Sequence, residues 1–485
     1  MRNAARIAPP PRLSRKPEHR VPRAYESAPP DAILFISVAC LVAIGMVMVF
    51  SASSTTAYAV HHDVAYFFKR QLMWLGIGSL AAWGAFRIDY TKLRTYAPAL
   101  FIATTLALVA VLVPHLGKGA GGSSRWLGAG PITLQPSEIA KLAFALFAAD
   151  LVARRERCRD QLHELVLPLA LVAAILGALI LKQPDLGTAI VVVGIAAILW
   201  YAGGVRGRLL ATVVGVLAVL GSILVLAAPY RRARLLAFLN PFGHASTVGY
   251  QLVQSLASLG SGHLAGHPMA NAVSPWLLPN ASSDFIFAAI GNDFGLLGCL
   301  AVVCGFACFG WLGIRIALRA EDRYRALLAT AITGWIVFQA LVNMGGVTGL
   351  LPDTGIPLPF MSSGGSSLIV VLFACGLLAN IARQPRASTE LVATPARAAT
   401  TATPPPRRSA RSQSPARAGA RRPTAPARRA ATSARTEPHR GATGSRQRGG
   451  HPRPAAKVPQ RSRAPRRSSA PRRSGVMAGS RAEAR

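Results

Sequence analysis

Apolar runs recur along most of the chain and are separated by short polar or glycine-rich loops. Many of them approach or exceed the roughly 20 residues that an α-helix needs to cross the hydrocarbon core of a bilayer. The pattern predicts ten helices, near residues 33–52, 71–86, 97–115, 137–152, 165–181, 187–203, 208–227, 285–317, 326–345 and 364–383. The eighth run is long enough to be tilted or broken. The pattern therefore indicates an all-α polytopic membrane protein.

Composition separates this membrane part from two polar tails. The 485 residues are 51% hydrophobic and only 15% charged, yet the formal net charge is +35. Residues 386–485 hold 24 basic and three acidic residues and no aromatic one, a composition that cannot bury enough apolar surface to fold alone. We predict a cytoplasmic basic N-terminal tail (1–30), a transmembrane domain (31–385) and a disordered Arg/Ala/Pro-rich cytoplasmic tail (386–485).

Basic residues mark one side of the predicted bundle. They gather in the loops after the second, fourth, sixth and eighth helices and in both tails, so by the positive-inside rule these segments face the cytoplasm. The opposite loops then face outward, and the longest, 228–284, precedes the eighth helix. Gly, Pro and polar residues at membrane depth are tolerated only where they are buried in protein or line an aqueous cavity. We therefore expect a site at the outer leaflet.

The arginine-rich tail (386–485) favours contact with anionic lipid headgroups, since each Arg near such a surface contributes on the order of 1 kcal/mol. Nucleic acid is the less favoured partner, because no aromatic residues interleave the arginines for base stacking. The sequence contains no P-loop, no dinucleotide fingerprint in a strand–helix setting and no metalloprotease helix, which argues against those enzyme classes. The six cysteines have no metal-ligand spacing, so no metal site is predicted.

Three carboxylates stand at outward helix starts. Asp284 follows two serines before an apolar run, Asp185 follows a proline, and Glu138 follows Pro-Ser. Each could cap a helix or complement its dipole, a structural role worth about 1 kcal/mol. Glu138 and Lys141 also share one helical face, and an ion pair on a membrane helix should face the bundle interior or a cavity. We favour a cavity-lining pair, with a structural clamp as the alternative.

Five separated motifs carry a family resemblance. In chain order they are RWLGAGPITLQPSEIAK, QPDLGTA, GYQLVQSLASLGSG, SSDFIFAAIG and TGIPLPFMSSGGSSL. Together they resemble the SEDS family (FtsW, RodA, SpoVE) over residues 51–383, and the FSASS stretch at 50–54 is nearer to the FtsW and SpoVE branch. The resemblance implies a ten-helix peptidoglycan glycosyltransferase that polymerises lipid II outside the bacterial cytoplasmic membrane. It also implies a class B penicillin-binding protein as partner, other divisome or wall-synthesis proteins, and a place at the division septum or a related wall-building site.

The resemblance implies that Asp284, directly before FIF, is the catalytic residue. The chemistry calls for such a group, because a sugar hydroxyl attacks an anomeric carbon and a carboxylate can accept its proton as the bond forms. The leaving lipid-linked pyrophosphate is already an anion and needs positive charge rather than an acid. Arg or Lys side chains can supply that charge, and so can a divalent cation such as Mg or Mn; the sequence fixes no cofactor.

The substrate-binding candidates are polar and charged residues of the outward loops and the motifs. They are Arg125, Trp126, Glu138, Lys141, Asp185, Arg231, Arg232, Arg234, Gln251, Gln254 and Ser255. The GIPLPF and SSGGSS segment is predicted to form a re-entrant turn into the last helix. Phosphate binding by its backbone N–H groups is a weaker alternative.

The chain departs from the family pattern around the proposed base. The family usually has Glu, His, Thr and Glu at four positions where this chain has Asn280, Ser282, Ser283 and Asn292. Ser363 replaces a usual Tyr, while Asp293 keeps an acid. Losing neighbouring acids changes the field at Asp284. Two other hypotheses therefore stay open: a non-catalytic scaffold for the penicillin-binding protein, and a transporter (flippase) for lipid-linked precursor.

Overall fold

Long helices make up most of the structure, a computed structural model that describes residues 30–120, 123–129, 132–155, 162–267 and 278–383. Within these ranges one long helix lies on each of the ten predicted runs. They are α1 (Pro30–His61), α2 (Tyr66–Arg87), α3 (Tyr90–Leu112), α4 (Pro136–Arg154), α5 (Leu167–Lys182), α6 (Leu186–Gly203), α7 (Gly207–Ala227), α10 (Ile286–Arg319), α11 (Arg323–Val347) and α12 (Gly365–Arg383). The predicted all-α polytopic architecture is confirmed.

Seven of the helices in the described ranges are long and apolar enough to cross a membrane: α1, α3, α5, α6, α10, α11 and α12. The other three fall short for different reasons. Helix α2 carries Lys69, Arg70 and Arg87, and α4 carries Glu138 and Lys141. Helix α7 contributes only a shorter apolar stretch. Length and mean hydropathy alone thus identify fewer membrane spans than the pattern of apolar runs separated by polar loops predicts.

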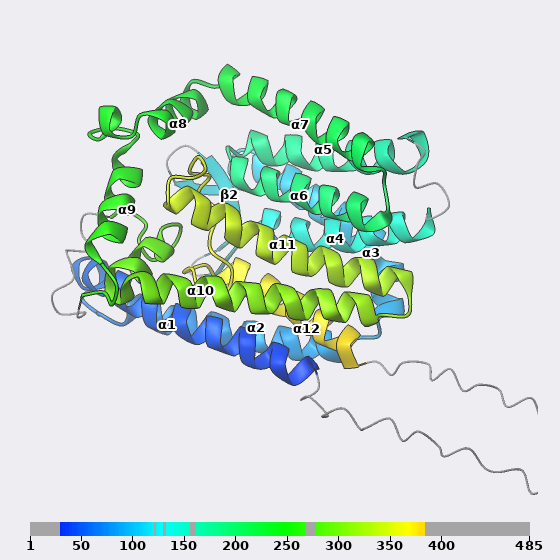
Figure 1. Cartoon of the computed structure of the whole chain (residues 1–485), viewed down its shortest axis with the longest axis horizontal. Helices are drawn as coiled ribbons and strands as arrows, with labels where there is room; N and C mark the ends of the chain where they lie inside the picture. The colour runs from blue at the N-terminus through cyan, green and yellow to red at the C-terminus, as the bar shows by residue number, and fades with distance from the viewer. Residues whose placement is uncertain (1–29, 121–122, 130–131, 156–161, 268–277, 384–485) are drawn as a thin grey trace, which may run out of the picture. The chain divides into compact units, whose positions relative to one another are not determined.

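Short elements gather at one end of the long helices, where Figure 1 shows β2, α8 and α9. Strands β1 (Lys118–Ala120), β2 (Ser123–Ala129) and β3 (Ile132–Leu134) form an antiparallel sheet in the order β1-β2-β3. The sequence predicted only a loop there. A π-helical turn, η2 (Leu162–Val166), precedes α5; helix α8 (Pro229–Leu239), the 3₁₀ turn η3 (Phe242–His244) and helix α9 (Tyr250–Ser261) fill the long loop before α10.

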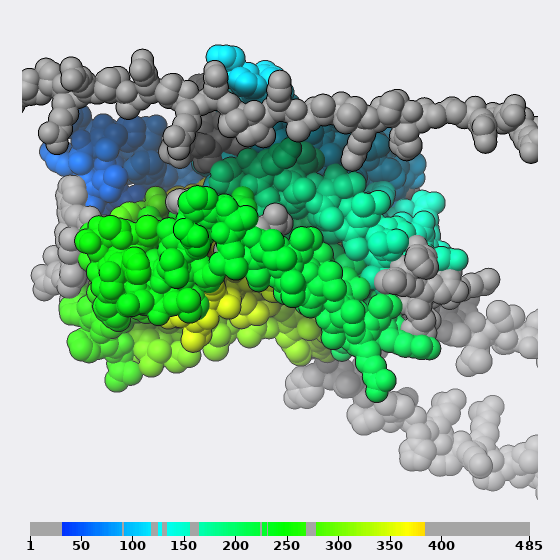
Figure 2. Space-filling view, turned by 90° about the horizontal axis from the view of Figure 1, so that it is seen from above, coloured from blue at the N-terminus to red at the C-terminus, as the bar shows by residue number. Residues whose placement is uncertain are grey.

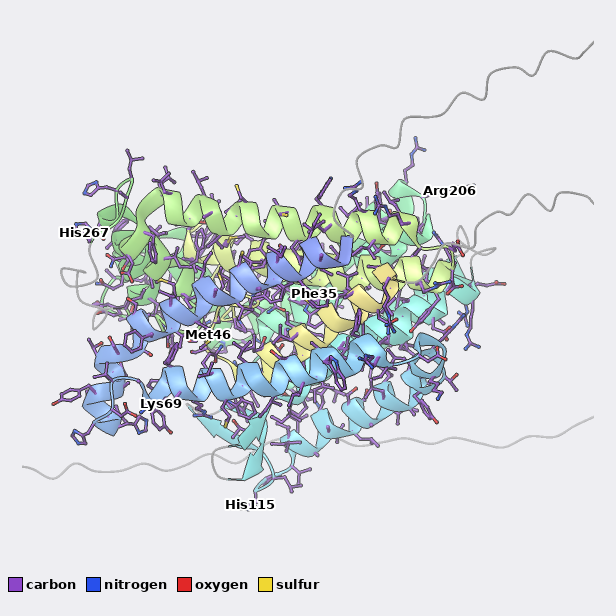
Figure 3. All side chains as sticks on the ribbon, turned by 90° about the horizontal axis from the view of Figure 1, so that it is seen from below. Phe35, Met46, Lys69, His115, Arg206 and His267 are labelled. Carbon is purple, nitrogen blue, oxygen red and sulfur yellow. The ribbon has the colours of Figure 1, made fainter. Side chains whose placement is uncertain are left out.

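The basic loops meet at the opposite end of the bundle. Figure 3 shows Lys69 and His267 at one end and Arg206 at the other. At the Arg206 end, Arg94 pairs with Asp150 near the end of α4 at 2.6 Å and lies over the ring of Tyr324 at the start of α11. The alternation of loops between two ends therefore agrees with the predicted topology. The tails, 1–29 and 384–485, lie outside the described residues.

Of the two long helices named above for their charged residues, α2 and α4, helix α4 has more buried residues. It packs against α3, α6 and α11, and both Phe144 and Leu146 are fully buried. This position explains how a helix with three buried charged residues, Glu138, Lys141 and Asp150, belongs to a membrane bundle, because these groups face protein rather than lipid. Helix α12 lies close against α2, where a Cβ at Gly376 would overlap the backbone of Ala82.

Helix α10 is broken at Gly295, as the length of its apolar run allowed. Gly295 has φ 63° and ψ −158°, and a Cβ there would stand 2.5 Å from the amide nitrogen of Gly266. Only glycine fits both the conformation and the space. The segment after α9 closes the break, since the N–H of Leu296 donates to the His263 carbonyl at 2.9 Å.

The segment between α11 and α12, residues 352–364, is largely buried although it has no regular secondary structure. Ile356 and Leu358 are 2% and 1% exposed. Two amides on α11 hold it: Gln339 Nε2 donates to the Pro357 carbonyl at 2.9 Å, and Asn343 Nδ2 to the Ile356 carbonyl at 2.7 Å. The predicted turn into the last helix is present. In Figure 2, yellow atoms, the colour of this part of the chain, show beside the green arch of α7 to α9.

Candidate active site at one end of the bundle

Asp284 lies in the turn directly before α10 and is partly buried. The N-cap position of α10 is Phe285, with no side-chain capping hydrogen bond. Asp185 differs, because its carboxylate accepts hydrogen bonds from the N–H and Oγ1 of Thr188 at 3.0 and 2.8 Å and so caps α6. The capping role considered for both residues is therefore observed for Asp185, whereas the Asp284 carboxylate stands at a helix start that no side chain caps.

Hydrogen bonds fix the backbone on both sides of Asp284. Asn343 Nδ2 donates to the Asp284 carbonyl at 2.8 Å, and the N–H of Phe285 donates to the Asn280 carbonyl at 3.3 Å. Asn280 has φ 58°, a left-handed conformation that Asn adopts more readily than most residues. The Asn at this position, a departure from the family pattern, thus suits the turn that presents Asp284.

Two further departures from the family pattern contact each other across this turn. The N–H of Ser363 donates to the Ser282 carbonyl at 2.8 Å, and the two hydroxyls are 3.4 Å apart. Ser362 Oγ donates to the Ser283 carbonyl at 2.6 Å. The segment before α12 and the turn before α10 are therefore joined by at least three polar contacts, which keep Asp284 in place relative to residues 352–364.

Charged groups from two other segments of the chain lie near Asp284. Arg234 of α8 lies 3.5 Å from Asp353, measured from Nη1 to Oδ2. A Cβ added at Gly355 would stand 3.7 Å from Asp284 Oδ2 and 3.8 Å from Arg234 Nη1, so the carboxylate and the guanidinium flank the same glycine. Gly355 needs to be glycine there, since its φ is 64°. Asp284, Arg234 and Asp353 therefore form one outer cluster.

Burial raises the pKa of Asp284 to about 6, with the nearby Asp353 carboxylate as the next cause. Asp185 raises that pKa further, while Arg234 and Arg125 lower it. Desolvation and like charge both disfavour the ionised form. A carboxylate with a pKa near 6 is ionised at neutral pH and is a stronger base than an ordinary aspartate, which suits it to accept a proton from a hydroxyl.

Arg125 belongs to the edge of this site. It extends from β2, and its Nε and Nη2 donate to the carbonyls of Gln183 and Pro184 at 3.0 and 2.5 Å. The small sheet is thereby tied to the start of α6, where Asp185 lies. Trp126 follows on β2 and is partly buried. Arg125 thus lies within electrostatic reach of Asp284, while these two hydrogen bonds go to the backbone.

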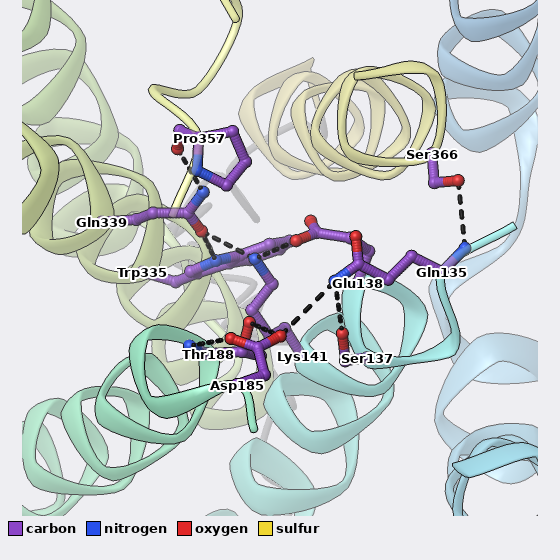
Figure 4. Close-up of polar contacts among 10 residues, drawn as sticks. All are labelled: Gln135, Ser137, Glu138, Lys141, Asp185, Thr188, Trp335, Gln339, Pro357 and Ser366. Atoms are coloured by element: carbon purple, nitrogen blue, oxygen red, sulfur yellow. Dashed lines mark hydrogen bonds and ion pairs between the residues drawn. The ribbon is translucent and has the colours of Figure 1, made fainter. Parts of the chain in front are cut away.

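Glu138 and Lys141 form a second, interior cluster, shown in Figure 4. Lys141 Nζ lies 2.9 Å from Glu138 Oε1 and 2.8 Å from Gln339 Oε1, and its ammonium stands 5.3 Å from the ring centre of Trp335. The side chains of Glu138 and Lys141 are 1% and 0% exposed. The pair is enclosed by protein rather than open to a substrate, which agrees with the structural clamp and not with the cavity-lining pair that the sequence favoured.

The other predicted residues are dispersed. Arg231 Nη2 donates to the Leu181 carbonyl at 2.7 Å, Arg232 is exposed, and Ser255 is buried and donates to the Val347 carbonyl at 2.8 Å. Gln251 and Gln254 lie partly buried on α9. In the described part of the chain, no group of three or more His, Cys, Asp or Glu residues is placed to hold a metal ion.

Sequence reasoning missed Asp353 and Asn343. Asp353 had a usable signal, because it is one of only 19 acidic residues and lies in an outward loop between Pro352 and Thr354. Asn343 had none, since a lone amide on an apolar helix is compatible with many roles.

Comparisons with known proteins show which family the chain resembles. A family model described as "Cell cycle protein", for FtsW, RodA and SpoVE, matches residues 31–387. The chain is 38% identical over 366 residues to a "Probable peptidoglycan glycosyltransferase FtsW" of Geobacter metallireducens, which covers 75% of this chain and 96% of the relative. It is 37% identical over 359 residues to "Stage V sporulation protein E" of Bacillus subtilis, with 74% and 98% covered.

Two solved structures are similar to the chain. One is a chain from a peptidoglycan synthase complex described as coordinating polymerization and crosslinking, with a TM-score of 0.62, 28% identity, and 72% of this chain and 96% of that chain covered. The other is the rod shape determining protein RodA of Thermus thermophilus, with a TM-score of 0.54, 27% identity, and 72% and 95% covered.

Proposed function

The chain belongs to the family of FtsW, RodA and SpoVE and is a peptidoglycan glycosyltransferase, and on this premise we propose that it polymerises lipid II with Asp284 as the catalytic base. The observation that carries the proposal is the placement of Asp284: partly buried, at the uncapped start of α10, with Arg234 and Asp353 beside it. The reaction takes place at the outer face of the cytoplasmic membrane, during cell division or a related wall-building event.

In this reaction Asp284 accepts the proton of the attacking sugar hydroxyl while the new bond to the anomeric carbon forms. The bond from that carbon to the pyrophosphate oxygen breaks, and the lipid-linked pyrophosphate leaves with the electron pair. Arg234 flanks Gly355 together with the Asp284 carboxylate, and Arg125 also acts electrostatically on Asp284. Positive charge fixed in place before the reaction stabilises the leaving anion without reorganising solvent.

The partner proposed for the chain is a class B penicillin-binding protein that crosslinks the new glycan. Support comes from the similar chain found in a peptidoglycan synthase complex described as coordinating polymerization and crosslinking. We further propose that both termini face the cytoplasm and that the arginine-rich tail binds anionic lipids. The tail proposal depends on the charge of residues 386–485, which lie outside the described residues.

The test is lipid II polymerisation by the purified full chain with its class B partner, comparing wild type, Asp284→Asn and the control Asp63→Asn. Asp63 is a suitable control because it is an acid paired with Lys69 at 2.9 Å in an outer loop, remote from Asp284 in the sequence. We expect polymer from wild type and Asp63→Asn, and a loss of about 10²- to 10⁴-fold for Asp284→Asn.

Two results would overturn the proposal. If Asp284→Asn polymerised lipid II at the wild-type rate, Asp284 would not be the catalytic base. No polymer from folded wild type with a partner that crosslinks would favour a scaffold, or a transporter if lipid II moved between leaflets.

A further inference from the structure

We propose that Asp353 is a positioning residue that holds the Arg234 guanidinium beside Asp284 until the pyrophosphate of the substrate displaces it. The inference rests on the proposed function, because it assigns a partner to the same site. Asp353 itself touches neither the attacking sugar nor the anomeric carbon in this account; it acts through Arg234 and through its charge.

The geometry gives Asp353 two separate contacts. Its Oδ1 accepts a hydrogen bond from the N–H of Gly355 at 3.0 Å, which closes a local turn. Its Oδ2 faces Arg234 Nη1 at 3.5 Å. The first contact shapes the loop and the second reaches across to α8. One carboxylate thereby links the segment before α12 to the helix that carries the phosphate ligand.

The contact between Asp353 and Arg234 is weak enough for the pyrophosphate to replace Asp353 as the partner of Arg234. At 3.5 Å it is longer than a charge-assisted hydrogen bond, which is about 2.7–2.9 Å, and the side chains of Arg234 and Asp353 are 32% and 23% exposed. A pyrophosphate offers the guanidinium more negative charge and bidentate geometry. Arg234 can therefore move from Asp353 to the substrate, because the Asp353 carboxylate is partly exposed and does not become a buried, unpaired charge.

Asp353 also affects the base. The charged groups that face Asp284 are Asp353, Arg234, Asp185 and Arg125. Loss of the Asp353 carboxylate would remove a like charge beside Asp284 and leave the positive charge of Arg234 less compensated, and both effects would make Asp284 less basic. The charge of Asp353 thus opposes substrate binding, since it repels pyrophosphate, while it supports catalysis by keeping Asp284 a strong base.

The test compares Asp353→Asn with wild type, with Asp63→Asn as the matched control. Asn at 353 keeps an acceptor for the Gly355 N–H, so the loop contact survives and only the charge is lost. We expect the KM for lipid II to fall about 3- to 10-fold, kcat to fall by a similar factor, and the acid limb of the pH–rate profile to move about 1 pH unit lower. Asp353→Glu should restore part of each value.

A binding measurement keeps the inference testable apart from turnover. Wild type, Asp353→Asn and Asp63→Asn are titrated with a polyprenyl pyrophosphate in nanodiscs, and Asp353→Asn should bind about 3- to 10-fold more tightly. Unchanged affinity, or weaker affinity, would overturn the inference even if wild type polymerises lipid II. Absence of polymer from wild type would count against the proposed function instead, while the binding result would still decide whether Asp353 competes for Arg234.

Discussion

The outer cluster, Asp284, Arg234 and Asp353, and the interior cluster, Glu138, Lys141 and Gln339, are both groups of charged and polar side chains in an apolar bundle. They differ in how deeply their ion pairs are buried and in how short those pairs are. Lys141 is fully buried, with an ion pair and an amide acceptor within 3 Å. In the outer cluster the ion pair of Arg234 with Asp353 is 3.5 Å long and partly exposed, and Asp284 stands beside another acid.

The difference shows what a carboxylate at membrane depth can do. A buried pair with short contacts holds helices together and has little reason to change its proton or its partner. A carboxylate with a raised pKa and an exchangeable cation can take up a proton and release an anion. We therefore assign structure to the interior cluster and chemistry to the outer one, and the following predictions test that division.

The largest expected effect on stability comes from Lys141→Met. This change leaves the Glu138 carboxylate buried without its cation, which should cost about 3–5 kcal/mol of unfolding free energy. Thermal unfolding in a matched detergent measures it. The double variant Glu138→Gln/Lys141→Met removes both charges and should recover most of the loss. Similar melting of wild type and Lys141→Met would mean that the interior cluster holds nothing together.

A smaller loss is expected for Gln339→Leu, which separates the interior cluster from the segment before α12. Gln339 accepts from Lys141 and Trp335 and donates to the Pro357 carbonyl. Leaving these buried groups unpaired should cost about 1–3 kcal/mol. Polymerisation at a temperature where the variant stays folded should also fall, because residues 352–364 carry Asp353. Full polymerisation activity with a lowered unfolding free energy would show that the interior cluster does not affect the reaction at the outer cluster.

The pH dependence of polymerisation sharpens the contrast further. With a pKa of about 6, Asp284 becomes protonated as the pH falls through that value, so activity should decline about fivefold from pH 6 to pH 5. The sign for stability is opposite: the raised pKa favours the folded state below the unfolded value of 3.8, and this contribution is lost as pH rises through about 6. An acid limb near pH 4 in the polymerisation rate would contradict the assigned base.

The smallest effect is expected for Asp185→Asn. Asn caps a helix about as well as Asp, so unfolding free energy should change by less than about 0.5 kcal/mol. Asp185 is a secondary influence on Asp284, so polymerisation should stay within about twofold of wild type. A loss as large as that of Asp284→Asn, measured in the same assay, would move Asp185 from a cap into the reaction itself.

The sequence predicted the helical bundle because long apolar runs leave few alternatives. It also left open that the eighth run is tilted or broken, and the family resemblance pointed to the turn at Asp284. It could not predict the three short strands, where Gly-rich sequence reads as a loop. Nor could it separate the two clusters, since Glu138 and Asp284 both follow a serine at a helix start and only packing decides their exposure.

The departures from the family pattern are clearer in the structure than in the sequence. Asn280 suits a left-handed turn, and Ser282 and Ser363 contact each other across it. Asn292 bonds to Asp293, whose carboxylate accepts from Ser51 at 2.6 Å. A second carboxylate near Asp284 comes instead from Asp353, which lies 69 residues farther along the chain. The turn that carries the proposed base, Asp284, thus keeps its hydrogen bonds despite these changes.

Lipid II polymerisation by Asp284→Asn, at a concentration of folded protein verified by its unfolding midpoint, tests the division of roles most directly. Burying the Asp284 charge is unfavourable, so the neutral Asn should leave the midpoint at pH 7.5 equal to that of wild type or higher. We predict this midpoint together with a polymerisation rate about 10²- to 10⁴-fold below wild type. Polymer at the wild-type rate from the folded variant would contradict the account.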